Sequence, residues 1–72
     1  MTTFTATFTN GRTITRNNKT GRTYTHGWAT FFANGNVRDS GFSSSRDAAI
    51  RAARAQMPNQ GAVSYEVAEA GA

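Results

Sequence analysis

Hydrophobic and polar residues alternate at the start of the chain. In the stretch "TFTATF" the apolar residues Phe4, Ala6 and Phe8 occupy every second position and threonines occupy the others. This period of two is typical of a strand with one buried and one solvated face. The dipeptide Asn10-Gly11 follows directly and is a strong signal for a tight turn. The pattern therefore predicts that the chain begins with a β-hairpin.

The register of this hairpin depends on the length of its turn. A two-residue Asn-Gly loop puts Ile14 opposite Thr7, away from the phenylalanines, whereas a three-residue loop with a bulge pairs Phe8 with Ile14. We therefore predict the bulged turn, with Arg16 across from Ala6 near the end of the ladder. The following "NNKTG" is polar and ends in glycine, which predicts a loop.

A second alternating segment, from about residue 22 to residue 33, predicts a longer strand. The even positions form one face and the odd positions the other; we expect the even face, which carries Trp28 and Phe32, to be buried. Gly27 and Gly41 are expected to mark bends or bulges, because glycine inside a strand often does so.

A second Asn-Gly pair, at residues 34–35, predicts another hairpin. A two-residue turn there pairs Phe32 with Val37, which gives Val37 a place in the core. The same turn pairs Phe31 with Arg38, whose aliphatic stem would cover the ring.

The chain then becomes rich in alanine and arginine, which predicts a helix over about residues 45–57. Ser44 and Asp47 form an approximate capping box, and Pro58 with Gly61 ends the segment. We expect a small apolar face to pack on the sheet and a charged face to be solvated. The apolar face holds Ala49, Ile50, Ala53 and Met57, and the charged face holds Asp47, Arg51 and Arg54. Asp47 and Arg51 are expected to form an i,i+4 pair.

The last segment, "AVSYEVA" at residues 62–68, alternates as a strand with Val63, Tyr65 and Val67 pointing inward. Residues 69–72 are expected to be a frayed tail. The whole chain, residues 1–72, is thus predicted to be one α+β domain in the order β-β-β-β-α-β. It consists of a small antiparallel sheet with one helix packed on one face.

Length and composition restrict the function to the surface. A chain of 72 residues without cysteine has a small core and no disulfide or thiolate metal site. No apolar run approaches the roughly 18 to 20 residues that span a bilayer, and the first residues lack the features of a signal peptide. We therefore expect no membrane association and a cytoplasmic location, in the host cell if a phage encodes the chain.

Catalytic chemistry finds little support in the sequence. His26 is the only histidine, and the carboxylate side chains are Asp39, Asp47, Glu66 and Glu69. Metal sites and acid–base pairs need several such groups in convergent positions. The serines at 43–45 precede a predicted helix and are better explained as caps. We expect neither an enzyme nor a metal site nor a cofactor.

The formal net charge is +4, and no acidic residue precedes Asp39. Arginine outnumbers lysine seven to one, and a guanidinium binds carboxylate or phosphate with two parallel hydrogen bonds. Such charges are either solubilising or a binding surface, and Tyr24 is either core or a stacking platform. The candidate partner-binding residues are Arg12, Arg16, Lys19, Arg22, Tyr24 and Arg38, with Arg51 and Arg54 as a second candidate face.

The segment "GWATFFANGNVRDSGFSSSRDAAIRAARAQ", followed by "AVSYEVA", resembles the layout of small proteins from phages and mobile elements. Several anti-CRISPR proteins are among them. The resemblance is one of layout over roughly residues 27 to 68, and it brings no shared catalytic motif. It implies a stoichiometric inhibitor that docks on a CRISPR effector complex and obstructs target DNA. Many such inhibitors are acidic mimics of DNA, whereas this chain is basic.

The partner is accordingly expected to be a protein or nucleoprotein complex with an acidic patch, or DNA or RNA itself. An anti-CRISPR-like inhibitor is the leading hypothesis, and a small basic nucleic-acid-binding module is the alternative. A structural phage component comes third. The protein itself is expected to be a monomer or a small homodimer.

Overall fold

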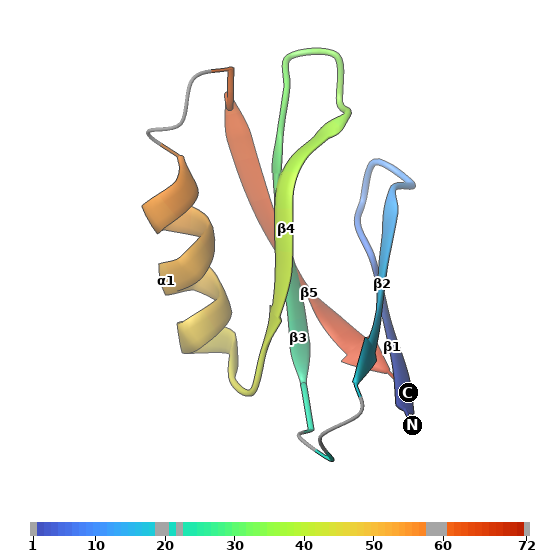
Figure 1. Cartoon of the computed structure of the whole chain (residues 1–72). Helices are drawn as coiled ribbons and strands as arrows, with labels where there is room; N and C mark the ends of the chain where they lie inside the picture. The colour runs from blue at the N-terminus through green and yellow to red at the C-terminus, as the bar shows by residue number, and fades with distance from the viewer. Residues whose placement is uncertain (1, 19–20, 22, 58–60, 72) are drawn as a thin grey trace.

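The computed structural model describes residues 2–18, 21, 23–57 and 61–71, which form five antiparallel strands and one helix (Figure 1). The elements are β1 (Thr2–Thr7), β2 (Thr13–Asn18), β3 (His26–Phe31), β4 (Val37–Ser43), α1 (Arg46–Gln56) and β5 (Ser64–Gly71). The predicted α+β class and the order β-β-β-β-α-β are confirmed. Within the described residues, no helix is long and apolar enough to cross a bilayer.

The strands form one sheet in the order β2-β1-β5-β3-β4, so the last strand lies in the middle. β5 pairs with β3 from Phe31↔Ser64 to His26↔Glu69, but it pairs with β1 only at Thr5↔Gly71 and Ala6↔Ala70. Beyond this short junction, the β1–β2 hairpin packs against β3 and β4. Figure 1 shows the helix on one side of the β3–β4–β5 unit and the hairpin on the other.

The C-terminal residues 69–71 belong to β5 and are not a frayed tail, so that prediction was wrong. They lie between β1 and β3, and the amide of Ala70 also donates to the carbonyl oxygen of Thr25 at 2.9 Å. Glu69 pairs with β3, and Ala70 and Gly71 pair with β1, so this segment has backbone hydrogen-bond partners of its own. The alternation of side chains in the sequence does not show such pairing.

The first turn is a three-residue bulged loop, but its register differs from the prediction. The amide of Phe8 donates to the carbonyl of Arg12 at 2.8 Å, and Gly11, with φ of 87°, donates back to Phe8 at 2.9 Å. The positive φ favours glycine at this bulge position. Ile14 therefore lies opposite Ala6, and Arg16 lies opposite Phe4 instead of Ala6. The error of two residues leaves Ile14 on the predicted face, because side chains alternate with a period of two.

The second turn repeats the first, and the predicted two-residue loop was wrong. The amide of Phe32 donates to Asn36 and that of Gly35 donates to Phe32, both at 2.9 Å, and φ of Gly35 is 88°. Val37 consequently pairs with Phe31, not with Phe32. The register shifts between Thr30 and Phe31, which leaves Arg38 as an extra residue in β4, not opposite Phe31.

β3 is shorter than predicted, and both of its faces are buried. Trp28 packs against Ala49 and Ala53 of α1, as expected for the even face. The odd face, which holds Ala29 and Phe31, packs against the β1–β2 hairpin. The prediction of one buried face was wrong because a hairpin distant in sequence covers the second face.

The residue that caps the N-terminus of the helix is Ser45, one residue later than predicted. The hydroxyl of Ser45, and not that of Ser44, accepts a hydrogen bond from the amide of Ala48 at 3.1 Å. Ala49 and Ala53 are fully buried, whereas Ile50 and Met57 are only partly buried. Among the described residues, no ion pair joins Asp47 to Arg51.

The helix leaves part of β5 uncovered. Val67 packs against the cluster formed by Trp28, Ala49 and Ala53, but Val63 and Tyr65 are 59% and 40% exposed. The burial predicted for Val63 and Tyr65 was wrong, because the helix contact is centred on Trp28 and Val67.

The outer face of the β1–β2 hairpin carries exposed threonines. Thr3 donates to the side-chain oxygen of Asn17 at 2.6 Å, and the hydroxyls of Thr7 and Thr13 are 3.3 Å apart. These β-branched residues occupy the solvated face of a sheet, which is their ordinary position.

Two glycines of the sheet allow close approaches instead of marking the predicted bends. An added Cβ at Gly27 would lie 2.6 Å from Cβ of Ala6 and 3.1 Å from Cδ1 of Ile14. An added Cβ at Gly41 would lie 2.7 Å from Nε1 of Trp28. The absence of a side chain at Gly27 thus lets the β1–β2 hairpin pack closely on β3. The absence of one at Gly41 leaves room for the indole ring of Trp28.

The contact at Gly27 predicts the effect of one methyl group. We expect Gly27→Ala to lower the free energy of unfolding by about 1 to 3 kcal/mol, since packed backbones must separate to admit it. Gly71→Ala is the matched control, because no heavy atom lies within 4 Å of the added Cβ. Urea denaturation of both variants checks this, and equal midpoints would contradict the packing of the hairpin on β3.

Trp28 should be essential for stability. Its side chain is 9% exposed and lies between Gly41 and the helix alanines. Trp28→Ala is expected to cost about 3 to 5 kcal/mol, which is enough to unfold a domain of this size. A cooperative melt near the Tm of the unaltered protein would show that Trp28 is not part of the core.

Candidate functional site

The basic candidates that the structure describes do not form one cluster. Arg12 lies at the tip of the first hairpin, and Arg16 lies four residues further along β2, a distance of about 13 Å in an extended strand. Lys19 and Arg22 fall outside the described residues. Each of the other candidates therefore has to be considered in its own surroundings.

Arg12 joins the tips of the two hairpins. Its Nη2 donates to Oδ1 of Asn36 at 2.6 Å, and Nδ2 of Asn10 donates to the carbonyl oxygen of Gly35 at 3.3 Å. Within each turn the asparagine oxygen also accepts from the amide two residues later, at 2.9 Å for Asn10 and 3.0 Å for Asn34. Arg12 thus has a structural partner, although it was predicted as a binding residue.

Glu66 holds the first turn against the central strand. Its carboxylate accepts hydrogen bonds from the amide and from the hydroxyl of Thr9, at 2.8 Å and 2.7 Å. Hydrogen bonds to a charged group are stronger than those between neutral groups. Nothing in the sequence indicated this contact. The sequence did carry a signal that the two turns share one geometry, in the similar stretches "FTNGR" and "FANGN".

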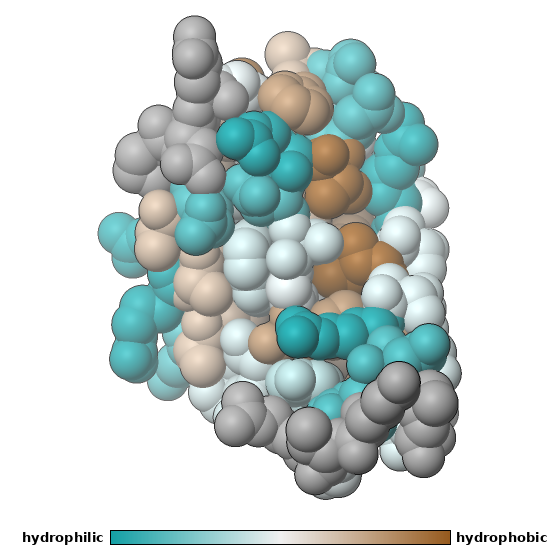
Figure 2. All heavy atoms as spheres, in the orientation of Figure 1, coloured by the Kyte–Doolittle hydropathy of each residue, from teal (hydrophilic) through white to brown (hydrophobic). Residues whose placement is uncertain are grey.

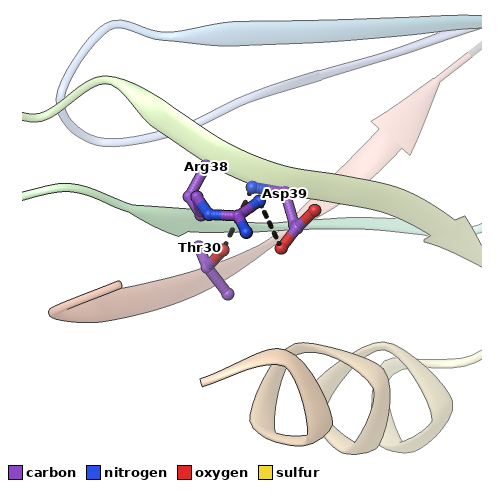
Figure 3. Close-up of polar contacts among 3 residues, drawn as sticks. All are labelled: Thr30, Arg38 and Asp39. Carbon is purple, nitrogen blue, oxygen red and sulfur yellow. Dashed lines mark hydrogen bonds and ion pairs between the residues drawn. The ribbon is translucent and has the colours of Figure 1, made fainter. Parts of the chain in front are cut away.

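Arg38 is paired with its own neighbour (Figure 3). Its Nη1 lies 3.2 Å from Oδ2 of Asp39, and the amide of Asp39 donates to Oγ1 of the buried Thr30 at 3.1 Å. The two charged side chains are 34% and 31% exposed, so solvent screens the pair. The adjacent carboxylate reduces the positive field that Arg38 offers to a partner.

Arg16 and Tyr24 are the predicted residues that the structure brings together. The Cζ atom of Arg16 lies 5.7 Å from the centroid of the Tyr24 ring, within the range of a cation–π contact. Arg16 forms no ion pair with any described residue, in contrast to Arg38. It is exposed although it extends from the inward face of β2.

Tyr24 is half-buried, so it belongs to the core and to the surface at once. Its ring meets Phe4 edge-on at 5.3 Å and Phe42 at 5.9 Å with a tilt of 44°. The neighbouring amide of Thr25 donates to the carbonyl of Ser43 at 3.0 Å, which fixes the segment before β3 against the end of β4. Tyr24 is therefore held in place on more than one side.

Beside Tyr24 lies an open hollow of about 500 Å³. Its lining comes from the segment before β3, the end of β4 and the first turn of α1, and consists of Tyr24, Phe42, Ser43, Ser44 and Ala48. Sequence reasoning did not find this hollow, because the serines were assigned to the helix cap and Phe42 to no site. We call it the Tyr24–Phe42 hollow.

Figure 2 shows hydrophobic atoms at the surface between β4 and β2, with more polar residues on either side. The partly buried apolar residues Val37 and Phe42 of β4 pack there against the core that contains Ile14 of β2. The Tyr24–Phe42 hollow thus lies beside an apolar seam of the molecule.

The second predicted face, on the helix, differs in its chemistry. Arg51 and Arg54 are exposed and line a smaller hollow of about 300 Å³ together with Ile50 and Asp47. The carboxylate of Asp47 opposes the binding of an anion at this position. By contrast, no acidic side chain is among the described residues that line the Tyr24–Phe42 hollow.

His26 lies opposite Glu69 in the β3–β5 pairing, but in the described part of the chain no hydrogen bond or ion pair joins their side chains. Its Nδ1 is 2.8 Å from Oγ1 of Thr25. In the described ranges of the chain, no three histidine, cysteine or carboxylate side chains are grouped as metal ligands would be.

Comparison of the chain with protein families, with curated proteins and with solved structures found no match.

The Thr9–Glu66 contact predicts a loss of stability when the charge is removed. We expect Glu66→Gln to lower the free energy of unfolding by about 1 to 3 kcal/mol, because it removes the charge and replaces one of the two oxygens that accept from Thr9 by an NH2 group. Glu69→Gln, on the same strand and exposed, should change it by less than about 0.5 kcal/mol. Thermal or urea unfolding of both variants measures the difference. Equal losses of stability would mean that the Thr9–Glu66 contact does not stabilise the fold.

Proposed function

We propose that this chain is a non-catalytic binding protein whose partner is an anionic macromolecule. The observation that carries the proposal is the position of Arg16, which is exposed, lies within cation–π range of Tyr24 and has no acidic partner among the described residues. Arg12 and Arg38 have partners within the fold. A guanidinium held against an aromatic ring loses little freedom when it binds carboxylate or phosphate.

An anti-CRISPR-like inhibitor is the specific form of this proposal that the resemblance in layout supports. In this form the protein acts in the cytoplasm of the host cell, docks on an acidic patch of a CRISPR effector complex and obstructs target DNA. The net charge of +4 supports attraction to an acidic surface rather than imitation of DNA.

Direct binding of nucleic acid is the second candidate function. The observation in its favour is again the Arg16–Tyr24 pair, since basic side chains interleaved with aromatic rings are common in proteins that bind single strands.

The two candidates are separated by one set of measurements. Purified effector complexes from several CRISPR types are mixed with the protein, and the binding of target DNA is followed by gel shift. In parallel, the protein is titrated with free duplex and single-stranded DNA at two salt concentrations, because phosphate contacts weaken steeply with salt. Loss of target binding without affinity for free DNA supports the inhibitor. The reverse result supports the nucleic-acid module, and no effect in either assay would contradict the proposal.

The basic segment around Arg16 should govern binding and not folding. Replacing Arg16, Lys19 and Arg22 by serine is expected to weaken the complex by a factor on the order of a thousand, if two desolvated arginines are lost. Stability should change by less than about 1 kcal/mol, because exposed charges contribute little to folding.

The matched control for this variant is the helix face. Reversing the charge of Arg51 and Arg54 alters two exposed arginines that lie on α1. If this control abolishes binding while the triple variant binds normally, the interface is the helix face and Arg16 is a solubilising residue.

A further inference from the structure

The Tyr24–Phe42 hollow brings aromatic rings and hydroxyl groups together, with a guanidinium near one of the rings. Two aromatic rings with centroids 5.9 Å apart line it, and two serines and Ala48 complete the lining. Arg16 is not part of the lining, but its Cζ lies 5.7 Å from the centroid of the Tyr24 ring. Flat apolar surface with polar groups beside it and a cation nearby is the combination that recognises a nucleotide.

The polar groups of this hollow are not occupied by the fold. The hydroxyls of Tyr24, Ser43 and Ser44 form no hydrogen bond to the described part of the chain, whereas Ser45 next to them caps the helix. A hydroxyl can donate and accept, so it adapts to either kind of group on the edge of a base. The hollow therefore has free polar groups of the kind that hydrogen-bond a planar heterocycle.

We propose that the Tyr24–Phe42 hollow binds an unpaired base of a single-stranded nucleic acid and that Arg16 contacts a neighbouring phosphate. This inference rests on the second candidate function, direct binding of nucleic acid, and names the part of the nucleic acid that the hollow would bind. A duplex hides the faces of its bases, and an acidic protein patch offers carboxylates without a planar ring for Tyr24 and Phe42. The net charge of +4 complements a phosphate backbone.

The rigidity of the site favours such a ligand. Tyr24 is packed against Phe4 and Phe42, and the hydrogen bond from Thr25 to Ser43 fixes the two segments that line the hollow. A ring that is already immobilised loses little conformational freedom when a base stacks on it.

The test compares two single strands that carry the same number of phosphates, one with bases and one without, and adds a duplex whose bases are paired. A fluorescently labelled oligothymidylate, an abasic oligomer of equal length and a duplex are titrated with the full chain at low salt. Stacking of one base typically changes affinity by a factor on the order of ten or more. We therefore expect the oligothymidylate to bind about tenfold more tightly than the abasic oligomer or the duplex.

A variant that obstructs the hollow tests the location. Ala48 lines the hollow from the first turn of α1, so Ala48→Leu places three more carbon atoms in it without removing any packing. This variant should bind the oligothymidylate only as well as the abasic oligomer. Ala55→Leu makes the same change at an exposed position of α1 outside the hollow and should bind like the unaltered protein.

The outcomes of these titrations separate a failure of the base site from a failure of the proposed function. If all three oligomers bind equally, or if Ala48→Leu binds like Ala55→Leu, the base site is wrong while an anionic partner is still supported. If no oligomer binds, the base site is likewise overturned, and the assay with effector complexes then decides the proposed function independently.

Discussion

The arrangement of this protein depends on how closely the first hairpin approaches β3. At Gly27 there is no room for a methyl group, because an added Cβ would lie 2.6 Å from Ala6. This contact buries Ala29 and Phe31 beneath the hairpin, while α1 covers Trp28 on the opposite face. A small chain without disulfides thereby buries both faces of one strand, and the short β1–β5 junction lets the sheet bend enough to achieve it.

The candidate site is a consequence of the same packing. The hairpin and β4 meet along an apolar seam, and Tyr24 lies at one end of it between Phe4 of β1 and Phe42 of β4. The opposite end is occupied by the two turns, which Arg12 and Asn36 link to each other, while the Thr9–Glu66 contact holds the first turn on β5. Of the two described arginines in the β1–β2 hairpin, Arg12 therefore links the turns and Arg16 is available for a partner.

Local patterns predicted the elements well, and long-range packing decided what they could not. Alternation placed Phe4, Phe8 and Trp28 correctly in the core, and the Asn-Gly pairs located both turns. The registers were wrong because the bulge glycine is the third loop residue in each case, which the dipeptide alone does not specify. The sequence also brought Arg16 and Tyr24 forward as candidates, but Phe42, Ser43 and Ser44 join them only through the pairing of β3 with β4 and of Thr25 with Ser43.

The most direct test of this account is the mapping of backbone amide signals by NMR during a titration with oligothymidylate. The account predicts that the largest changes fall on the residues that line the Tyr24–Phe42 hollow, namely Tyr24, residues 42–44 and Ala48, and on the neighbours of Tyr24, namely Arg16 and Thr25. The helix face with Arg51 and Arg54 and the two turns should change little. Changes concentrated on that helix face or on the turns, with the hollow unaffected, would contradict it.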